Sequence, residues 1–453
     1  MGAFHAYDIR GIYGVDFDKQ TAYKVGYFIP ELLKTDRVLV GHDCRVSSPE
    51  IHEYLIKGIT DAGADAYDLG LTSTPMVYFA TAYYGFDASV QITASHNPAE
   101  YNGMKVSRAN ALPVALESGL GTIKQWIEEG KPTPVAEKKG QVIAKDFHDD
   151  YMNFMKPYIG DYSSLNIAFD LSNGMANLFA KEVYGDKPSY IFDEIDGRFP
   201  NHEPNPLIPK NVEPLKQLVK EKKADVGVIY DGDADRVMFV DEKAQFVAPD
   251  LVIALMSEYF VKERGAKNPV VLQEIRSSKA VSEFLEPMGA EVHTWRVGRA
   301  FAAPKLREID GLWGGELAGH YYFKDFFYSD SGLLASLIVL RIVAKLKEQG
   351  ITLSEAIGKI AHYQNSGEIN FRLEDKKGAM DAVRAHFTAQ ETATKSMDFD
   401  GYRVEFADWW FNIRPSNTEP YLRFICEATT EEKLQQKIAE TKELLKTQFN
   451  AQM

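Results

Sequence analysis

Two short segments of the chain combine residue types that could hold and transfer a phosphoryl group. The first is Thr93-Ala94-Ser95-His96-Asn97-Pro98, which follows the apolar, β-like run 88–92. Because the segment ends in proline, we expect Ser95 on a tight loop at the end of a strand, a common place for functional side chains on α/β scaffolds. A serine in this place can carry a phosphate. An ordinary Ser/Asn/Pro turn is the simpler interpretation of this segment taken alone.

The second segment is Asp231-Gly232-Asp233-Ala234-Asp235-Arg236, in which three carboxylates alternate with small residues. The small residues let the backbone turn, so that the side chains of Asp231, Asp233 and Asp235 can converge. Three anions held close together repel one another unless a cation lies between them. Hard oxygen ligands at this density favour Mg²⁺. The pattern therefore predicts a magnesium site.

Two other interpretations of the aspartate segment are weaker. In an EF-hand calcium loop the first aspartate would be position one and Glu242 position twelve, but Arg236 stands where the loop needs glycine. The flanking runs 226–230 and 237–240 are also expected to be strands, whereas an EF-hand loop joins two helices. The aspartyl-phosphate hydrolases use a motif that resembles Asp-x-Asp-x-Thr, and Asp235 occupies the position of its threonine.

Two further segments contain groups suited to sugar and phosphate recognition. They are Gly315-Glu316-Leu317-Ala318-Gly319-His320 and Arg414-Pro415-Ser416-Asn417-Thr418-Glu419-Pro420. In their order and spacing, the four segments resemble the signature of the α-D-phosphohexomutase family, which includes phosphomannomutases and phosphoglucomutases. Shorter matches at 4–11, 41–45 and 101–105 spread the resemblance over residues 4 to 420.

The resemblance implies a role for each of these segments. Ser95 would be a phosphoserine that transfers the phosphoryl group, and one oxygen of its phosphate would join Asp231, Asp233 and Asp235 in binding Mg²⁺. His96 and Arg236 would steady the phosphoserine and the metal loop. Lys105 and His320 would move protons to and from sugar hydroxyls, and Arg10 would stabilise the moving phosphoryl group. The residues expected to contact substrate are Glu316 and Ala318 at the sugar, Arg414, Ser416, Asn417 and Thr418 at the phosphate that does not react, and Tyr7, Arg45, Arg236, Arg276 and Arg299 along the cleft.

The resemblance also implies an activity. We expect a Mg²⁺-dependent phosphohexomutase that interconverts the 1-phosphate and the 6-phosphate of mannose or glucose. The phosphoserine would give its phosphoryl group to the substrate, and the 1,6-bisphosphate so formed would return its other phosphate to the serine. A hexose 1,6-bisphosphate is the expected activator, because the enzyme must begin phosphorylated. A phosphoglucosamine mutase and a non-catalytic sugar-phosphate-binding relative are the alternatives.

Three residues depart from the pattern of the family. Ala318 stands where many relatives have serine, Arg299 where a histidine is common in bacterial enzymes, and His42 where arginine is frequent. These changes affect the expected contacts to the sugar. The residues expected to transfer the phosphoryl group are all present.

The elements that must position these segments alternate between strands and helices. Residues 37–41 form a β-branched run, Ser48-Pro49 offers an N-cap and a first-turn proline, and Ile51, Leu55 and Ile59 share one helix face. This β-α pattern recurs along the chain and changes to a mixture of strands and helices beyond about residue 366.

The resemblance implies an α/β fold of four domains around a central cleft, three similar α/β mixed-sheet modules and a smaller C-terminal α+β domain. The expected domains are residues 1–148 with the phosphoserine loop, 149–248 with the metal-binding loop, 249–365 with the sugar-recognition loop, and 366–453 with the phosphate-binding loop.

Composition narrows the choice of partners. The chain has 453 residues, enough for three or four domains, and a formal net charge of −14. A chain this acidic is a poor general binder of nucleic acid or anionic membranes, so we expect small hexose phosphates as the ligands. Cys44 and Cys426 lie too far apart in sequence to suggest a disulfide framework, and the longest apolar run, 333–340, is too short to span a bilayer. We therefore expect a cytoplasmic protein that is a monomer or a weak homodimer.

Overall fold

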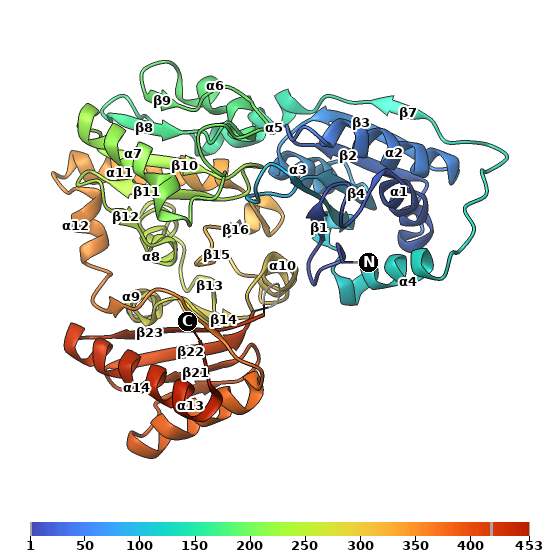
Figure 1. Ribbon diagram of the computed structural model, residues 1–453. Coiled ribbons are helices and arrows are strands. Elements are labelled where there is room, and N and C mark those ends of the chain that lie inside the picture. Colours follow the sequence, from blue (N-terminus) through green and yellow to red (C-terminus); the bar gives the residue numbers. More distant parts are fainter. Residues whose placement is uncertain (1, 417–419, 453) are drawn as a thin grey trace.

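The computed structural model describes residues 2–416 and 420–452. These residues form four β-sheets in chain order, each covered by helices, and we name the corresponding parts domains I to IV (Figure 1). The first three domains are α/β and the fourth is a smaller α+β unit, which confirms the predicted fold class. Among the described residues, no helix has the length and apolar character needed to cross a bilayer.

Domain I contains a seven-stranded sheet with the strand order β1-β5-β4-β2-β3-β7, and β6 pairs with β5. Its elements are β1 (Ile9–Ile12), α1 (Lys19–Leu33), β2 (Arg37–His42), α2 (Ser48–Asp61), β3 (Asp65–Leu71), α3 (Thr74–Tyr83), β4 (Ala88–Ile92), β5 (Tyr101–Arg108), β6 (Leu112–Pro113), α4 (Gly121–Glu128) and β7 (Val142–Ala144).

Domains II and III each contain a five-stranded sheet, with strand orders β12-β11-β10-β8-β9 and β14-β13-β15-β16-β17. The elements of domain II are α5 (His148–Met155), β8 (Ile167–Asp170), α6 (Ala180–Tyr184), β9 (Ser189–Ile191), α7 (Pro209–Lys222), β10 (Val226–Tyr230), β11 (Val237–Asp241) and β12 (Phe246–Val247). Those of domain III are α8 (Pro249–Leu255), β13 (Val270–Glu274), α9 (Lys279–Leu285), β14 (Glu291–Trp295), α10 (Arg299–Glu308), β15 (Trp313–Gly315), β16 (Tyr321–Phe323), β17 (Ser329–Asp330), α11 (Gly332–Glu348) and α12 (Leu353–Gly358).

Domain IV contains a six-stranded sheet with the order β18-β23-β22-β21-β20, and β19 pairs with β23. Its elements are β18 (Gln364–Asn365), β19 (Ile369–Arg372), α13 (Lys376–Gln390), β20 (Lys395–Met397), β21 (Tyr402–Glu405), β22 (Trp409–Pro415), β23 (Tyr421–Ala428) and α14 (Glu431–Phe449). Every strand pairing in this sheet is antiparallel.

The first three sheets share one arrangement of strands. The orders β5-β4-β2-β3, β11-β10-β8-β9 and β16-β15-β13-β14 are equivalent: three strands are parallel, and the strand that follows the third in sequence pairs with it in the antiparallel direction. The loop at this change of direction is a hairpin connection in each domain. The three hairpin connections therefore occupy corresponding places in the three sheets.

Burial explains why the helices form where they do. In α2, Pro49 lies in the first turn and Ile51, Leu55 and Ile59 are buried on one face. Helix α11 is apolar on nearly all sides because it lies in the core and packs against β10 and β11. This confirms that the run 333–340 is a buried helix segment.

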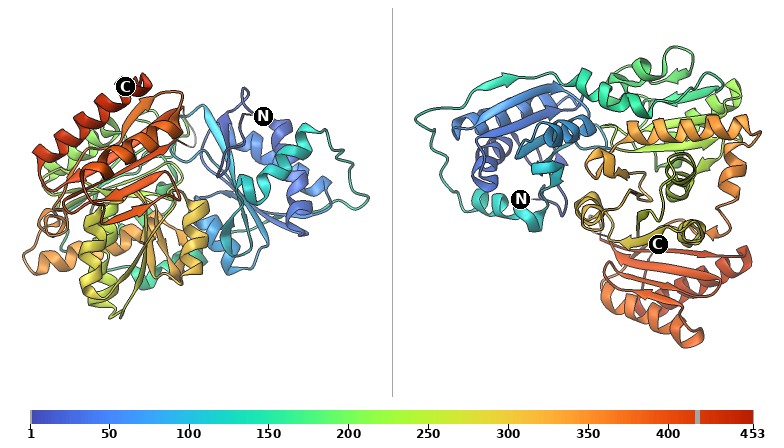
Figure 2. Two further views of the ribbon diagram at one scale, coloured as in Figure 1. Left: turned by 90° about the horizontal axis from the view of Figure 1, so that it is seen from below. Right: turned by 180° about the vertical axis from the view of Figure 1, so that it is seen from behind.

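The described residues form several apolar clusters, including a separate one within domain I. One large cluster runs from Leu39 in domain I to Ile360 in domain III and includes residues of all three α/β domains. Domain IV has a core of its own, formed by α13, α14 and the sheet. Figure 2 shows domains I and IV lying apart on the body formed by domains II and III.

The structure changes two details of the sequence interpretation. Ser47 rather than Ser48 is the N-cap residue of α2, and the Ser48 hydroxyl instead donates a hydrogen bond of 2.6 Å to Asp43. The aspartate segment joins β10 to β11, two antiparallel strands, so the EF-hand alternative is wrong.

Candidate active site

Three hairpin loops bring the predicted catalytic groups together. Ser95 follows β4, the aspartate segment follows β10, and residues 316–320 follow β15. The loops also bond to one another: Arg236 and His320 form a β-bridge, and the Thr74 amide at the start of α3 donates to the Asp233 carbonyl at 3.2 Å. The site is therefore held in place by domains I, II and III jointly.

Ser95 lies directly against the aspartate loop. It is 1% exposed and has a positive φ of 51°, a conformation that a non-glycine residue seldom adopts. Its hydroxyl donates a hydrogen bond of 2.9 Å to Asp231 and lies 3.2 Å from Nδ1 of His96. Burial and the positive charges of Arg236 and Arg10 hold the pKa of His96 well below its usual value. A neutral imidazole thus lies beside the serine oxygen.

Gly232 is required by this close approach. A Cβ atom at position 232 would lie 2.5 Å from the carbonyl oxygen of Ser95 and 3.2 Å from Pro204. Ala234 has a φ of 62°, which turns the backbone between the second and third aspartates. The two small residues of the loop therefore allow the three aspartate side chains to converge, as the sequence predicts.

Arg45 holds the loop of Ser95 in position through hydrogen bonds to its backbone. It is fully buried, and its two terminal nitrogens donate to the carbonyls of Ser95, Asn97, Pro98 and Tyr101 at 2.6–3.0 Å. Its Nε donates to Asp43 at 3.1 Å. Because every nitrogen is in use, the guanidinium has no surface to offer a substrate. We therefore correct its expected role from substrate contact to positioning of the loop.

The three aspartates form a group able to hold a metal ion. Asp231, Asp233 and Asp235 are all 0% exposed, and each offers an oxygen within 4.8 Å of the others. One oxygen of Asp233 and one of Asp235 are buried without a hydrogen-bond partner among the described residues. An unpaired buried carboxylate oxygen is costly, and a divalent cation is the partner that oxygen ligands of this kind favour. The residues present therefore fit a metal of the Mg²⁺ type.

Lys105 on β5 closes the group of aspartates on one side. Its ammonium lies 2.7 Å from Asp233 and 2.5 Å from Asp235. Burial lowers the pKa of Lys105, but the charges of the two carboxylates outweigh burial and raise this pKa well above its usual value. Lys105 is therefore an ammonium in this arrangement and can donate a proton.

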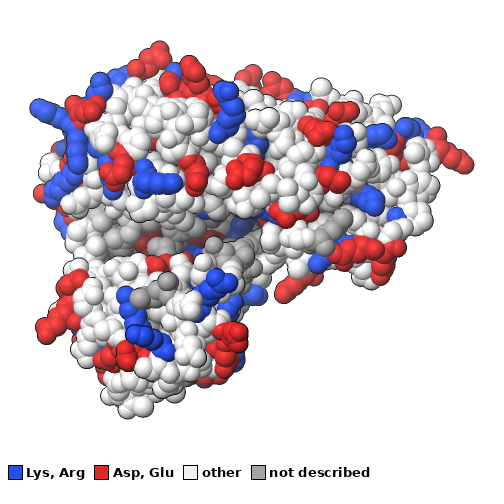
Figure 3. All heavy atoms as spheres, in the orientation of Figure 1, with Lys and Arg blue, Asp and Glu red and all other residues white. Residues whose placement is uncertain are grey.

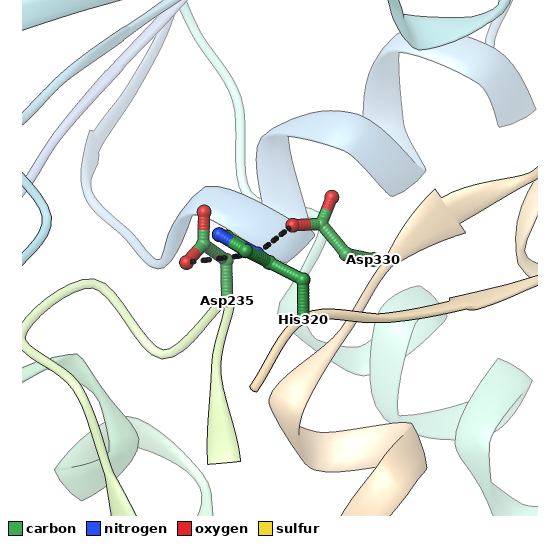
Figure 4. Close-up of side chains that lie close together, drawn as sticks. All are labelled: Asp235, His320 and Asp330. Carbon is green, nitrogen blue, oxygen red and sulfur yellow. Dashed lines mark hydrogen bonds and ion pairs between the residues drawn. The ribbon is translucent and has the colours of Figure 1, made fainter. Parts of the chain in front are cut away.

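His320 lies between two carboxylates from different domains, as Figure 4 shows. Its Nδ1 is 2.6 Å from Asp330 and 3.7 Å from Asp235, while its Nε2 is 2.9 Å from Nε of Arg236. Asp330 also accepts a hydrogen bond of 2.9 Å from Nε of Arg299. The guanidinium of Arg299 in turn stacks on the ring of Tyr78, 3.6 Å from its centroid.

A cavity of about 190 Å³ opens beside these groups. Glu316 is 2% exposed at its edge and accepts a hydrogen bond of 2.7 Å from Tyr322, and burial raises the pKa of its carboxyl group. The cavity brings together residues that the sequence predicts for the site and that come from domains I, II and III. They are Tyr7, Arg10, Lys105, Asp235, Arg236, Arg299, Glu316, Ala318 and His320.

The remaining predicted residues lie elsewhere. Arg276 is bound by both oxygens of Glu274 at 2.9 Å and by Glu368 of domain IV at 3.3 Å, so it joins domains III and IV instead of lining the cavity. Arg414 donates to Asp400 at 3.2 Å and also lies outside the cavity. Ser416 donates its amide to the carbonyl of Tyr421, at the base of the β22–β23 loop. Asn417 and Thr418 lie outside the described residues.

Three residues of the site were not found by sequence reasoning. Tyr78 and Asp8 line the cavity, and Asp330 is the buried carboxylate that joins His320 to Arg299. Asp330 belongs to Ser329-Asp330-Ser331-Gly332, a polar run directly before the longest apolar stretch. That contrast could have indicated a functional strand end. Nothing in the sequence around Tyr78 separates it from other buried aromatic residues.

A hollow lies at the surface between domain IV and the rest of the molecule. Figure 3 shows it between the domain at the bottom of the view and the larger body above.

Family models match all four parts of the chain. The models are described as phosphoglucomutase/phosphomannomutase alpha/beta/alpha domain I over residues 1–133, domain II over 149–244, domain III over 248–363, and the C-terminal domain over 368–444. Together the matches extend over most of the sequence and follow its order of domains.

Individual relatives agree with the family models. A phosphomannomutase of Salmonella typhimurium is 35% identical over 441 residues, which is 94% of this chain and 95% of the relative. A phosphomannomutase of Methanocaldococcus jannaschii is 35% identical over 451 residues, 98% of this chain and 97% of the relative. The crystal structure of a phosphoglucomutase/phosphomannomutase family protein from Burkholderia thailandensis matches with a TM-score of 0.87 at 26% identity, covering 100% of this chain and 99% of that one.

Proposed function

Because the chain belongs to the phosphoglucomutase/phosphomannomutase family, we propose that it interconverts the 1-phosphate and 6-phosphate of mannose or glucose through a phosphorylated Ser95. The observation that carries this proposal is the place of the Ser95 hydroxyl. It is bonded to Asp231 at 2.9 Å, next to a buried group of carboxylates, and beside a cavity lined by three arginines. Phosphoryl transfer depends on this combination of an exact position and charges of both signs.

Asp231, Asp233 and Asp235 would hold Mg²⁺, as the two unpaired oxygens in this group support. Bound there, the ion would offset negative charge on the transferring phosphoryl group. The protein itself supplies further positive charge at the cavity through Arg10, whose Nε is buried without a hydrogen-bond partner among the described residues.

The transfer step balances in bonds and protons. A bond forms between phosphorus and the sugar hydroxyl oxygen, the bond between phosphorus and Ser95 Oγ breaks, and the proton of the hydroxyl ends on Oγ. Lys105, an ammonium that lines the cavity, would give a proton to Oγ as the serine leaves, and the amine so formed would take the proton of the attacking hydroxyl. His320 is the other expected carrier, and its ring nitrogens, like the Lys105 ammonium, already take part in hydrogen bonds.

The return step uses the other end of the intermediate. A hexose 1,6-bisphosphate gives its second phosphate to Ser95 and leaves as the isomeric monophosphate. Since the two phosphates lie at opposite ends of the sugar, one reacts at Ser95 while the other must be held elsewhere. Arg414 and the β22–β23 loop are suited to this second task, because a guanidinium and backbone amides bind phosphate well. A hexose 1,6-bisphosphate is then the activator that phosphorylates resting enzyme.

Replacement of Ser95 tests the proposal. The purified protein should carry a phosphate in intact mass spectra, and peptide mapping should place it at residue 95. Ser95→Ala should reduce turnover of mannose 1-phosphate and glucose 1-phosphate by orders of magnitude, measured with glucose 1,6-bisphosphate present. Ser282→Ala on α9 is the control and should act like the unaltered enzyme, because within residues 2–416 and 420–452 this hydroxyl bonds only to the Lys279 carbonyl.

The substrates in the same assay separate the alternatives. A higher kcat/KM for glucosamine 1-phosphate than for either hexose would favour a phosphoglucosamine mutase. Binding of these compounds without turnover, in protein phosphorylated on Ser95, would favour a non-catalytic relative. Near-normal turnover by Ser95→Ala would rule out the proposed nucleophile.

A further inference from the structure

Asp330 is a buried carboxylate that serves two groups of the cavity at once. It ends the short strand β17, is 0% exposed, and accepts hydrogen bonds from His320 at 2.6 Å and from Arg299 at 2.9 Å. Burial would raise its pKa, but the hydrogen bond from His320 and the positive charge of Arg299 lower this pKa. Asp330 is therefore ionised, and an ionised carboxylate only accepts hydrogen bonds.

These contacts determine where His320 carries its proton. Nδ1 faces a carboxylate that can only accept, so Nδ1 must bear a hydrogen. Nε2 faces Nε of Arg236, which always donates, so Nε2 must be bare. A doubly protonated ring would direct an N–H group at the arginine. The geometry therefore places a hydrogen on Nδ1 of His320 and makes Nε2 the acceptor of Arg236.

The second contact of Asp330 reaches another domain. Arg299 begins α10 in domain III, and its Nη2 donates to the carbonyl of Ala111 in domain I at 2.9 Å. Its guanidinium also stacks on Tyr78 of domain I. The Asp330 carboxylate thus holds both His320 and Arg299. His320 contacts domain II through Arg236, and Arg299 contacts domain I.

A second metal site is a different interpretation of the same side chains. Asp235, His320 and Asp330 offer ligand atoms within 4.8 Å of one another (Figure 4). A metal would need a bare Nδ1, however, and this nitrogen lies at hydrogen-bond distance from Asp330. It would also compete with the aspartate group for Asp235. The contacts favour hydrogen bonding over coordination.

We propose that Asp330 is a positioning residue, which fixes His320 with its proton on Nδ1 and holds Arg299 against domain I, so that both face the cavity in one arrangement. Its effect on turnover rests on the proposed mutase function. Its effect on the histidine ring does not, and the two can be measured separately.

Nitrogen NMR of labelled histidine side chains tests the proton position directly in unaltered protein. The chain has ten histidines, so comparison with His320→Gln assigns the signals of this ring. We expect hydrogen on Nδ1 and none on Nε2. A ring with hydrogen on Nε2, or on both nitrogens, would overturn the proposal without any variant of Asp330. A second test uses a variant that lacks Asp233. If the His320 ring signals of that variant change on titration with a divalent metal, the proposal is also overturned.

Asp330→Asn keeps the shape of the side chain and removes its charge. A carboxamide can donate as well as accept, so the form of His320 with hydrogen on Nε2 should gain population. We expect kcat/KM for glucose 1-phosphate to fall about 10- to 100-fold, as for other residues that orient a functional group. In a His320→Gln background the same substitution should cost less, because part of its effect acts through the ring.

Asp68→Asn is the matched control. Asp68 accepts a hydrogen bond of 2.7 Å from His52 in domain I, a second Asp–His pair that lies outside the cavity. This variant should leave the signals of His320 and kcat/KM unchanged. A His320 ring that stays fully protonated on Nδ1 in Asp330→Asn, or full activity in that variant, would overturn the positioning role. Absence of turnover in the unaltered enzyme would count against the mutase function alone, since the ring signals would still decide this proposal.

Discussion

The three aspartates of the central loop do not share one electrostatic environment. Burial and the charges of Asp233 and Asp235 raise the pKa of Asp231 well above its usual value. Burial would also raise the pKa of Asp235, but the nearby Lys105 ammonium contributes to lowering it. The negative charge of the loop is thus only partly balanced by the protein, and a bound cation would complete the balance.

Removing one carboxylate should weaken metal binding and catalysis together. Asp233→Asn keeps the size of the side chain but removes a charge next to Lys105, so Mg²⁺ should bind more weakly in calorimetric titration. Because metal stabilisation of transferring phosphate amounts to several kcal/mol, kcat/KM should fall by about 100-fold or more. The surface variant Asp193→Asn in the same domain is the control, since the one ion pair of Asp193 in the described part of the chain is with exposed Lys181. Full activity with an unchanged Mg²⁺ requirement in Asp233→Asn would show that the metal lies elsewhere.

The loop around Glu316 should affect both hexoses alike. Mannose and glucose differ in the orientation of the C2 hydroxyl, whereas we expect Glu316 to accept hydrogen bonds from hydroxyls further round the ring. A hydrogen bond to a charged acceptor contributes about 1.5–3 kcal/mol, so Glu316→Gln should lower kcat/KM roughly 10- to 150-fold for each sugar. Ala318→Ser should change both values less. A loss confined to one sugar would mean that this loop recognises C2.

Residue types indicated some members of the site but not others. Ser95 and the aspartates could be found because their chemistry is unusual for the loops that carry them. Asp330 was not predicted: the polar run before the apolar stretch indicates only a strand end, and the importance of Asp330 comes from His320 and Arg299, which lie on other elements. The expected role of Arg45 failed for a related reason: only the folded chain shows that its donors all meet backbone carbonyls and Asp43.

At the scale of elements, the hairpin connections explain why the chemistry lies where it does. Each α/β sheet changes from parallel to antiparallel pairing at one strand, and each places a functional loop at this change. The sequence predicts the main strands well, because their apolar runs are buried on both faces. It does not indicate β7 or β20, since these three-residue strands at sheet edges are mostly exposed and form through pairing with a neighbour.

Helix α8 provides a pH-dependent test of burial against the helix dipole. Asp250 lies in its first turn, where the dipole favours a negative charge by roughly 0.3–1 kcal/mol. Burial, together with the charge of Glu427 in domain IV, nevertheless raises the pKa of Asp250 to about 7. The folded protein therefore binds a proton here that the unfolded chain has released above about pH 4. Asp250 should lower stability as the pH rises from about 4 to about 7.

Asp250→Asn removes this titration. The free energy of unfolding of this variant minus that of the unaltered protein should become about 2–3 kcal/mol more positive between pH 5 and pH 8. This change does not depend on the size of the difference at pH 5. Thermal midpoints of both proteins at the two pH values measure the change. Glu427→Gln, which removes the neighbouring charge, should show part of the same effect. An equal difference in midpoint at pH 5 and pH 8 would mean that Asp250 is ionised throughout this range.

At the scale of the whole molecule, domain IV is attached differently from the other three. One apolar cluster joins residues of domains I, II and III, in addition to a separate cluster within domain I, whereas the apolar cluster of domain IV includes no residue of another domain. Polar contacts are prominent between domains III and IV: Arg276 with Glu368, Ser278 with Glu427, and Arg403 with the carbonyls of Ile275 and Ser277. Polar interfaces of this kind permit relative movement of domains more readily than an apolar core does.

The cavity needs such a movement if it is to hold both phosphates of a hexose bisphosphate. Its volume of about 190 Å³ is below the roughly 300–1,000 Å³ of most ligand pockets. Arg414 lies outside it, with Nε buried and lacking a hydrogen-bond partner among the described residues. An anionic group could satisfy that nitrogen if domain IV closed over the hollow seen in Figure 3. We therefore expect ligand binding to draw domain IV toward the cavity.

Small-angle X-ray scattering with glucose 1,6-bisphosphate measures this closure. Ser95→Ala keeps the ligand intact during the measurement, and its radius of gyration should fall when the ligand saturates the site with Mg²⁺ present. Adding Arg414→Ala should weaken binding and reduce the compaction, because the phosphate would lose the charge that ties it to domain IV. Glucose alone, which has no phosphate to bridge the domains, should leave the scattering unchanged. Saturation shown by calorimetry with no change in the radius of gyration would mean that domain IV already holds its binding position in the free protein.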